Sequence, residues 1–281
     1  MAATLRVVSW NIRAAIGTGP FPDRWWSRVD AGRLRAIGDF LAGLDADVIA
    51  LQEVTVLSGE GTLVDQAGDL SRQLGMEMRY GAVRTFEAPG SGAGLFGNAL
   101  LAREALSEVR TVALPMAPSD AFVEPPGTDH PAAGRRYVDA PATIREPRCG
   151  LLASVGGLRI GTTHLSHVGS GERLLQVEAL VTAFDEAAPG LLLGDLNAAI
   201  DAPELAPLGG WTDAFAVPTR DPARISTDDG WSIDQVVVRG ASVGASVGEP
   251  AHVRREAGDL SDHYPVVAEI DVGEPDVRHS S

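Results

Sequence analysis

Polar side chains directly follow five apolar segments of the chain, and they are of the types that carry out acid–base catalysis or bind metal ions. Asn11, Glu53, His164, Asp195 and Asp262 mark the ends of these segments. Reactive groups of α/β proteins lie beyond the carboxyl ends of strands, so a site is expected where these ends meet. Taken alone, each has a structural explanation: Asn11 could cap a turn, Glu53 could join an ion pair, and His164 could be a hydrogen-bonded core histidine.

The carboxylates among these residues favour a hard divalent cation. Glu53, Asp195 and Asp262 each follow an apolar segment, where loss of water destabilises a charged group unless a partner compensates. On neighbouring strand ends, the three carboxylates would repel one another without a cation. Carboxylate oxygens suit Mg²⁺ or Mn²⁺, and a chain with a single cysteine cannot build a thiolate cage of the structural zinc type.

The elements that position these side chains are predicted as alternating strands and helices. Hydrophobic periodicity predicts helices over residues 30–44, 65–74 and 172–184. Short apolar runs predict strands over residues 5–12, 47–51, 98–102, 150–155, 158–163, 191–193, 232–239 and 265–270. On the third helix, the predicted apolar face consists of Leu174, Leu175, Val177, Leu180, Val181 and Phe184. Because no repeat and no linker-like composition break is present, we expect one α/β domain.

Composition indicates a globular protein. The chain has 281 residues, 44% of them hydrophobic and 22% charged, and no apolar run approaches the roughly 18 residues of a membrane span. Its first residues lack the pattern of a secretory signal, so we expect a cytoplasmic protein. The one cysteine, Cys149, has no neighbouring base and is expected to be a buried core residue. We also expect a monomer.

The charged residues narrow the function. All 23 basic residues are arginine, which excludes Schiff-base chemistry and the lysine of a phosphate-binding loop. The net charge is −15 at pH 7. This charge disfavours tight nonspecific binding to a polyanion, because such binding needs basic side chains that neutralise phosphates. A nucleic-acid partner is therefore possible but not favoured.

Six short motifs, taken in order, resemble those of the endonuclease/exonuclease/phosphatase superfamily, the DNase-I-like group. They are Trp10-Asn11-Ile12, Leu51-Gln52-Glu53-Val54, Thr163-His164-Leu165, Gly194-Asp195-Leu196-Asn197, Ile233-Asp234 and Ser261-Asp262-His263-Tyr264-Pro265-Val266. The resemblance covers about residues 5–270. It implies a four-layer α/β sandwich with two central mixed β-sheets flanked by helices. We expect this domain over residues 1–272 and a disordered C-terminal tail over residues 273–281.

The resemblance implies a metal-dependent hydrolase of phosphoric esters, with Mg²⁺ or Mn²⁺ as cofactor. Glu53 would be the principal metal ligand, and Asn11 and Asp262 would lie close to the ion. A cation there would stabilise the negative charge that accumulates on phosphate oxygens during attack.

The resemblance also implies five catalytic residues. Asp195 and Asn197 would orient the attacking water and the scissile phosphate. His164 would donate a hydrogen bond to a non-bridging phosphate oxygen. His263 would act as general base or acid, with Asp234 bound to its other ring nitrogen, because a carboxylate behind an imidazole sets its tautomer and raises its basicity.

Two positions depart from the family pattern. Gln235 stands where an aromatic residue often follows the Ile-Asp pair, which predicts altered packing beside Asp234 and His263. Arg13 stands where many nucleases carry an acidic residue. This change removes a carboxylate from the vicinity of the metal, and the sequence leaves the number of metal ions open at one or two.

Several residues are secondary candidates for substrate contact. Arg148 could clamp a phosphate or form an ion pair with Glu146, and His167 could line the site. Trp25-Trp26 could form a lip over the substrate or cover the first helix. The segment over residues 115–147 is rich in Pro, Gly, Ala and Asp, and it is predicted to be a surface insertion near the site.

Three functions remain open on the sequence. The first is a phosphoesterase that acts on a small or lipid-borne phosphodiester or phosphomonoester. The second is a DNA or RNA endonuclease or exonuclease of the same superfamily, which predicts a basic, aromatic-studded face. The third is a binding protein that kept the fold and lost catalysis, although none of the motif residues is missing. The identity of the substrate is left undetermined.

Overall fold

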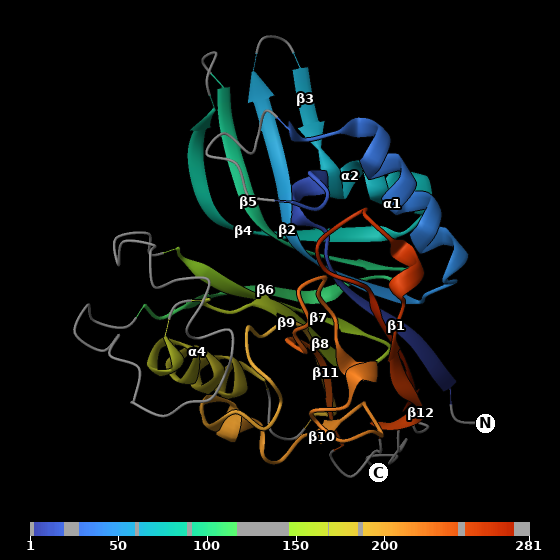
Figure 1. Ribbon diagram of the computed structural model, residues 1–281, viewed down its shortest axis with the longest axis vertical. Helices are drawn as coiled ribbons and strands as arrows, with labels where there is room; N and C mark the ends of the chain where they lie inside the picture. Colours follow the sequence, from blue (N-terminus) through green and yellow to red (C-terminus); the bar gives the residue numbers. More distant parts are fainter. Residues whose placement is uncertain are drawn as a thin grey trace, which may run out of the picture.

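The computed structural model describes residues 3–19, 28–59, 62–88, 92–116, 146–167, 169–184, 188–240 and 245–272. These residues form two mixed β-sheets that pack face to face, with helices on the outer faces (Figure 1). This is the four-layer arrangement that the sequence predicts. The Trp25-Trp26 pair, residues 117–145 of the predicted insertion and the predicted tail over residues 273–281 lie outside the described residues.

The first sheet has seven strands and carries Asn11 and Glu53. Its strand order is β12-β13-β1-β2-β5-β4, and β3 pairs with β2. Strands β1 and β2 run parallel, whereas the other pairs are antiparallel. The strands are β1 (Ala3–Asn11), β2 (Val48–Gly59), β3 (Thr62–Asp65), β4 (Glu77–Ala88), β5 (Gly92–Ala102), β12 (Ala245–Val253) and β13 (Val266–Val272).

The second sheet has six strands and carries His164, Asp195 and Asp234. Its order is β10-β11-β9-β8-β7-β6, and β8 and β9 form its parallel pair. Gly156 and Gly157, both with positive φ, form the turn of the predicted β7–β8 hairpin. The strands are β6 (Ser107–Leu114), β7 (Arg148–Val155), β8 (Leu158–His164), β9 (Gly190–Asp195), β10 (Thr212–Asp213) and β11 (Asp234–Arg239).

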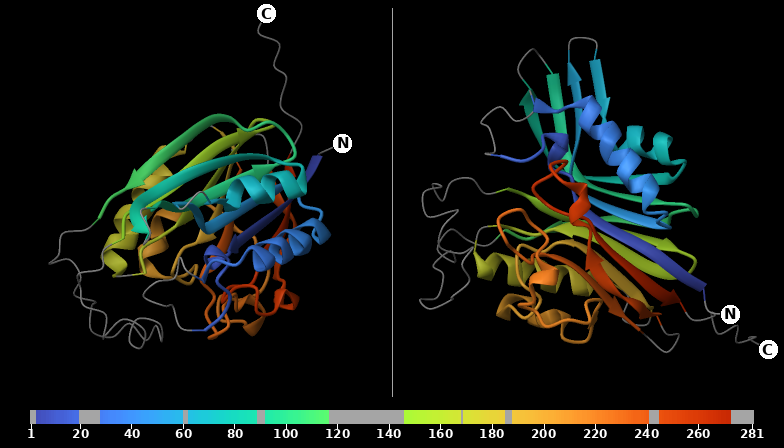
Figure 2. Two further views of the ribbon diagram at one scale, coloured as in Figure 1. Left: turned by 90° about the horizontal axis from the view of Figure 1, so that it is seen from above. Right: turned by 45° about the vertical axis from the view of Figure 1, so that its right-hand side comes forward.

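In the described residues, three α-helices cover the outer faces of the sheets. Helix α1 (Ala31–Gly43) and helix α2 (Gln66–Leu74) pack on the first sheet, and α4 (Ser170–Ala183) packs on the second (Figure 2). Asp30 and Asp65 cap α1 and α2 by accepting hydrogen bonds from the backbone N–H groups of Arg33 and Gly68. Short 3-10 helices span Arg13–Ala15, Pro203–Leu208, Pro222–Arg224 and Arg255–Ala257. In the described part of the chain, no helix is long and apolar enough to span a bilayer.

The main core lies between the sheets. It is made of fully or almost fully buried aliphatic residues from both inner faces, among them Val7, Val48, Leu100, Leu151, Ile160, Leu191, Leu193, Val236 and Ile270. Burial of this apolar surface stabilises the sandwich and holds the ends of its strands in a constant relative position. The two sheets therefore act as one rigid support for the side chains at their ends.

The three predicted helices and the predicted strands are confirmed, and Cys149 is buried as expected. The predicted apolar face of α4 is wrong at Leu175, whose side chain is exposed, because Arg173 and Gln176 occupy the buried face instead. Strands β3, β4, β6, β10 and β12 were not predicted. Most of β6 is exposed, so it lacks the apolar run on which strand prediction depends.

We predict that Gly97→Ala destabilises the fold by about 3 kcal/mol, because the added methyl group would force the backbones of two neighbouring strands apart. A Cβ atom at Gly97 would lie 2.0 Å from the carbonyl oxygen of Gly81 on the neighbouring strand β4. Gly43→Ala is the matched control, since nothing lies within 4 Å of its Cβ position at the end of α1. Urea denaturation measures both. Equal unfolding midpoints for the two variants would contradict the prediction.

Candidate active site

The candidate site lies where the ends of β1, β8, β9 and β11 meet the loop that precedes β13. Glu53 reaches it from the middle of β2 (Val48–Gly59), because this strand continues past the predicted end at residue 51. Strand register places His164 beside Asp195 and Asp195 beside Asp234. Buried Gln52 joins the two sheets, because its amide nitrogen lies 3.3 Å from Ser9 Oγ on the first sheet and 3.0 Å from Thr162 Oγ1 on the second. The pairing of strands and this link together bring side chains from both sheets to one place.

Asp195 is at the centre of the site. Its side chain is almost completely buried, and its Oδ2 lies 3.1 Å from Asn11 Nδ2, 3.3 Å from His164 Nε2 and 3.7 Å from His263 Nε2. Its Oδ1 accepts a 3.0 Å hydrogen bond from the backbone N–H of Asn197. Burial raises the pKa of Asp195 to about 6, although the charge of His263 opposes the rise. The carboxylate thus connects four of the predicted site residues.

Asn11 holds the carboxylates of the two sheets together. Its Nδ2 donates to Glu53 Oε1 and to Asp195 Oδ2, both at 3.1 Å. Its Oδ1 accepts a 3.0 Å hydrogen bond from the backbone N–H of Arg13. Because a backbone N–H can only donate, this contact determines which end of the Asn11 amide faces the carboxylates.

Glu53 projects from an irregular point of β2. The pairing of β2 with β5 shifts by one residue between Leu51 and Val54, and Glu53 has a φ of 56° within this bulge. Bulges redirect side chains, and here the bulge gives Glu53 a direction that regular strand geometry would not. Burial raises the pKa of Glu53 to about 7, and the nearby charge of Asp262 adds to the rise.

His263 and Asp234 form a hydrogen-bonded pair at the edge of the site. His263 Nδ1 lies 2.8 Å from Asp234 Oδ2, and the same oxygen accepts a 2.6 Å hydrogen bond from the hydroxyl of Ser226. The backbone around His263 is held as well, because Trp10 donates to its carbonyl oxygen and its N–H donates to Ser261 Oγ. The imidazole therefore has a defined orientation, with Nε2 directed toward Asp195.

The two histidines of the site have opposite pKa shifts. Burial alone lowers the pKa of His263, but the carboxylates of Asp234, Asp195 and Asp262 outweigh burial and raise the pKa well above its ordinary value. His164 is also buried, and burial together with the charge of Arg148 lowers its pKa well below the ordinary value. One imidazole is thus charged and the other neutral near pH 7, which suits different roles.

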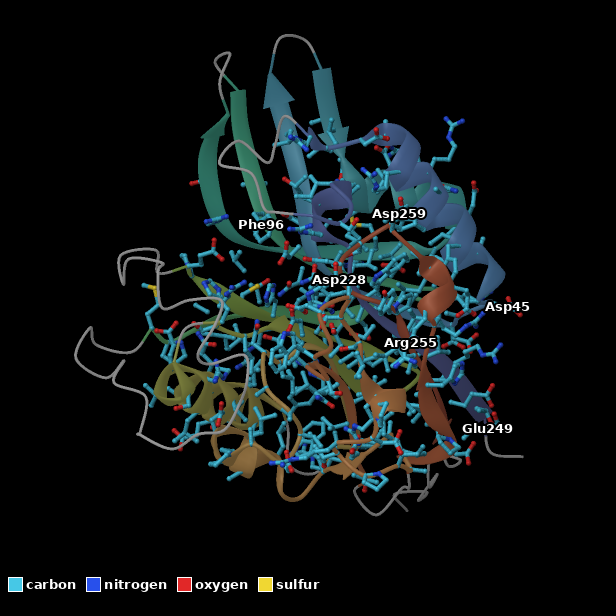
Figure 3. All side chains as sticks on the ribbon, in the orientation of Figure 1. Asp45, Phe96, Asp228, Glu249, Arg255 and Asp259 are labelled. Atoms are coloured by element: carbon cyan, nitrogen blue, oxygen red, sulfur yellow. The ribbon has the colours of Figure 1, made fainter. Side chains whose placement is uncertain are left out.

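Asp262 contacts an arginine on one side only. Its Oδ2 lies 3.1 Å from Arg13 Nε, whereas its Oδ1 is buried and has no hydrogen-bond partner. Glu53 Oε2 is likewise buried without a hydrogen-bond partner. The backbone N–H of Asp228, which Figure 3 labels near the centre of the molecule, donates to the Asp262 carbonyl oxygen at 2.9 Å. Two carboxylate oxygens without partners fit a hard divalent cation.

Among the described residues, one buried group has three potential ligand atoms within 4.8 Å of one another: Asp195, Asp234 and His263. This group could hold a metal ion. In the present arrangement, however, His263 Nδ1 and Asp234 Oδ2 bind each other, and the Asp195 oxygens already accept hydrogen bonds. The partner-free oxygens of Glu53 and Asp262 therefore fit the ion better.

The secondary candidates lie on one flank of the site. Arg148, the first residue of β7, is buried, and its guanidinium lies 3.1 Å from Glu146 and 3.0 Å from His167 Nδ1. Arg84 on β4 contacts the other oxygen of Glu146 at 2.8 Å. Burial and the charge of Arg148 lower the pKa of His167 to about 4. Arg148 does pair with Glu146, and substrate contact by Arg148 and His167 stays a prediction.

Sequence reasoning missed three residues that support the site. Gln52 was quoted only within a motif, and its role as the link between sheets was not predicted. Ser226 and Ser261 were not singled out as site residues, yet they bind Asp234 and the backbone of Asn11. Ser226 precedes Asp234 by eight positions in an irregular segment, so no local pattern indicated its contact. Gln235, one of the two positions that depart from the family pattern, accepts a 3.1 Å hydrogen bond from buried Arg224. The guanidinium of Arg224 packs over the ring of Phe215.

Comparisons with known proteins agree with the fold. Residues 8–263 match the model of the Endonuclease/Exonuclease/phosphatase family. The fold is similar to that of an endonuclease/exonuclease/phosphatase from Beutenbergia cavernae DSM 12333, with a TM-score of 0.68 and 23% identity over 96% of this chain and 72% of that one. No curated protein sequence gives a significant match.

Two further structures show the same fold. The human Nocturnin catalytic domain with bound sulfate has a TM-score of 0.66 and 15% identity, over 96% of this chain and 93% of that one. TDP2 of D. rerio in complex with a single-strand DNA product has a TM-score of 0.61 and 17% identity, over 96% and 100% of the two chains. At these identities the structures establish the fold, and the family model extends over most of the sequence. The chain belongs to the endonuclease/exonuclease/phosphatase family, the DNase-I-like group.

Proposed function

We propose that the chain is a divalent-metal-dependent phosphoesterase that hydrolyses a small or lipid-borne phosphodiester or phosphomonoester. Members of its family are generally metal-dependent phosphoesterases. The observation that carries the proposal is the environment of one oxygen, Asp195 Oδ2, which lies within 3.7 Å of Asn11, His164 and His263 side-chain nitrogens. A structural role alone would not bring two imidazoles and an amide to one buried carboxylate beside further carboxylates.

Glu53 and Asp262 are the proposed ligands of Mg²⁺ or Mn²⁺. Support comes from their buried oxygens that lack partners, Glu53 Oε2 and Asp262 Oδ1. Asn11 lies next to them and holds Glu53 through Oε1. When bound, the ion would supply positive charge to the phosphate oxygens, on which negative charge increases in the transition state.

Asp195, Asp234 and His263 are the proposed acid–base group. Asp234 binds His263 at Nδ1, which leaves Nε2 to exchange a proton with water or with the leaving oxygen. Asp195 can accept a hydrogen bond from a water molecule next to Nε2 and so direct its attack. Asn197 donates its backbone N–H to Asp195 and its side-chain amide to the Leu165 carbonyl oxygen, which supports a role in positioning.

His164 is the proposed donor to a non-bridging phosphate oxygen. Its Nδ1 is buried without a hydrogen-bond partner, and its low pKa keeps it a neutral donor near pH 7. We further propose that Arg148 and His167 contact the substrate from the flank of the site. Support comes from the charge of Arg148, which affects the pKa values of both Glu53 and His164.

Charge supports the choice of substrate class. The chain carries 38 acidic residues against 23 arginines. Three arginines near the site, Arg13, Arg84 and Arg148, already contact carboxylates of the chain itself. Binding to duplex nucleic acid gains most of its affinity from cations that neutralise successive phosphates, and cations engaged in this way contribute less to it.

Activity should require Mg²⁺ or Mn²⁺ and disappear when a chelator is added. Glu53→Gln should lower turnover at limiting Mg²⁺ by roughly 100-fold, because a neutral amide replaces a charged ligand of the same shape. Glu249→Gln, an exposed position on β12, is the control and should behave as the wild type. Hydrolysis of bis-p-nitrophenyl phosphate across a Mg²⁺ titration measures this. Full turnover of Glu53→Gln at limiting Mg²⁺ would show that Glu53 is not the ligand.

The affinity for Mn²⁺ should increase with pH up to about 7, the pKa to which Glu53 is raised, and change little above it. Below that pH a proton must leave Glu53 when an ion binds, so the affinity should rise roughly tenfold per pH unit. Isothermal titration calorimetry from about pH 5.5 to about pH 8.5, roughly 1.5 units on either side of this pKa, measures the affinity. A pH-independent affinity in the wild type would contradict the assignment of Glu53.

His263→Ala and Asp234→Asn should each reduce kcat, by about 1,000-fold and about 30-fold, while the fold stays intact. The double variant should be little slower than His263→Ala, because the two side chains act as one unit. His252→Ala, at an exposed histidine, is the control. Steady-state kinetics with circular dichroism tests the pair. Losses that multiply in the double variant would disprove a functional His263–Asp234 pair.

Small or lipid-borne esters should be hydrolysed faster than DNA. The comparison uses p-nitrophenyl phosphate, bis-p-nitrophenyl phosphate, phospholipid in mixed micelles and supercoiled plasmid, each with Mg²⁺ and with Mn²⁺. Plasmid nicking that exceeded the best ester rate, and that fell steeply between about 50 and 200 mM salt, would favour a nuclease instead. Metal binding without hydrolysis of any of the four would favour a binding protein.

A further inference from the structure

We infer that Arg13 is a built-in cation of the proposed metal site, and that its presence limits the chain to one divalent ion there. This inference rests on the proposed metal site of Glu53 and Asp262. It concerns the number and affinity of ions, so it can be tested without any substrate.

Asn11, Glu53 and Asp262 are the three residues predicted to surround the metal. Arg13 occupies one side-chain oxygen of Asn11 and one of Asp262. Its Nε lies 3.1 Å from Asp262 Oδ2, and its backbone N–H donates to Asn11 Oδ1 at 3.0 Å. Partner-free oxygens remain on Glu53 (Oε2) and on Asp262 (Oδ1). These oxygens remain for one ion at Glu53 and Asp262, whereas a second ion on Asn11 and Asp262 would need the oxygens that Arg13 already contacts.

The guanidinium of Arg13 is locked in this position. Its two terminal nitrogens donate to the carbonyl oxygens of Gly17 at 2.6 Å and Gly19 at 2.7 Å, and the residue is only 5% exposed. With Nε on Asp262, all three nitrogens have acceptors. Rotation away from Asp262 would leave buried donors and a buried charge without partners, which is costly.

The backbone that carries Arg13 is held just as firmly. Arg13, Ala14 and Ala15 have φ values of 48°, 50° and 57°, a left-handed conformation that such residues rarely adopt. Gln66 stabilises this turn by donating to the Ala14 carbonyl oxygen at 2.7 Å. The other end of the Gln66 amide accepts a 2.9 Å hydrogen bond from the Thr55 N–H, two residues beyond Glu53. One side chain thus couples the turn of Arg13 to the strand of Glu53.

The electrostatic consequence is a fixed positive charge beside Asp262. Arginine stays protonated at every pH that proteins tolerate, so this charge cannot be titrated away. A divalent ion placed at Asp262 Oδ2 would lie within a few Å of the guanidinium and would be repelled strongly in this buried environment. Arg13 therefore neutralises Asp262 in the way that a second metal ion would.

The test is a Mn²⁺ titration of the metal-free full chain, followed by electron paramagnetic resonance and by calorimetry. We expect one Mn²⁺ per wild-type chain. Arg13→Gln removes the charge and frees Asp262 Oδ2, so it should bind Mn²⁺ about tenfold more tightly or accept a second ion. Arg13→Lys keeps the charge and should bind one ion with nearly wild-type affinity. Arg72→Gln, a similar loss of charge at an exposed site, is the control.

Two results would overturn the inference. One is a wild-type chain that binds two Mn²⁺ ions with comparable affinity. The other is an Arg13→Gln chain that is folded by circular dichroism and binds Mn²⁺ as Arg13→Lys does. If Arg13→Gln does not fold, the stoichiometry of the wild type and of Arg13→Lys still decides. A wild-type chain that binds no Mn²⁺ would overturn the proposed metal site as well, whereas one bound ion without hydrolysis would count against the proposed activity alone.

Discussion

Burial of the Asp195 carboxylate is the constraint on which the site depends. An ionised carboxylate at the junction of two sheets is unfavourable unless donors replace the water it has lost. Asn11 from the first sheet and the Asn197 backbone supply hydrogen bonds, and the imidazoles of His164 and His263 lie close by. Each donor comes from a different segment, so satisfying this one group brings most of the proposed catalytic residues together.

The packing of the two sheets holds the side chains around Asp195 in fixed relative positions. The aliphatic core between them sets their separation, and Gln52 bridges them by contacts to Ser9 and Thr162 within that core. Buried polar contacts of this kind specify one relative position of the sheets, because any shift would leave the amide without partners. Function and stability oppose each other in this site: Arg13 pairs with one oxygen of Asp262, but Glu53 Oε2 and Asp262 Oδ1 are buried without hydrogen-bond partners, which the proposed ion would relieve.

Local patterns predicted the helices and most strands because their periodicity is visible within a few turns of chain. Helix α1 follows the spacing of Leu34, Ile37 and Leu41, each of which is buried. The same reasoning failed at Leu175, because the buried face of α4 is shared with the polar side chains of Arg173 and Gln176, which have partners in the folded protein. It also missed the exposed strand β6, since alternation with one buried face is absent there.

The sequence by itself determined the family through its motifs in order and, through the family, the two-sheet fold class, whereas local hydrophobic patterning determined the helices and most strands; it also supplied the motif residues as candidates for the site. Tertiary structure alone decided how those residues face one another. The orientation of the Asn11 amide depends on the Arg13 backbone and on carboxylates 42 and 184 positions away. The pairing of Arg13 with Asp262 likewise joins opposite ends of the chain. Hydrogen bonds and ion pairs depend on distances of a few Å between atoms, and only the packed sheets set those distances.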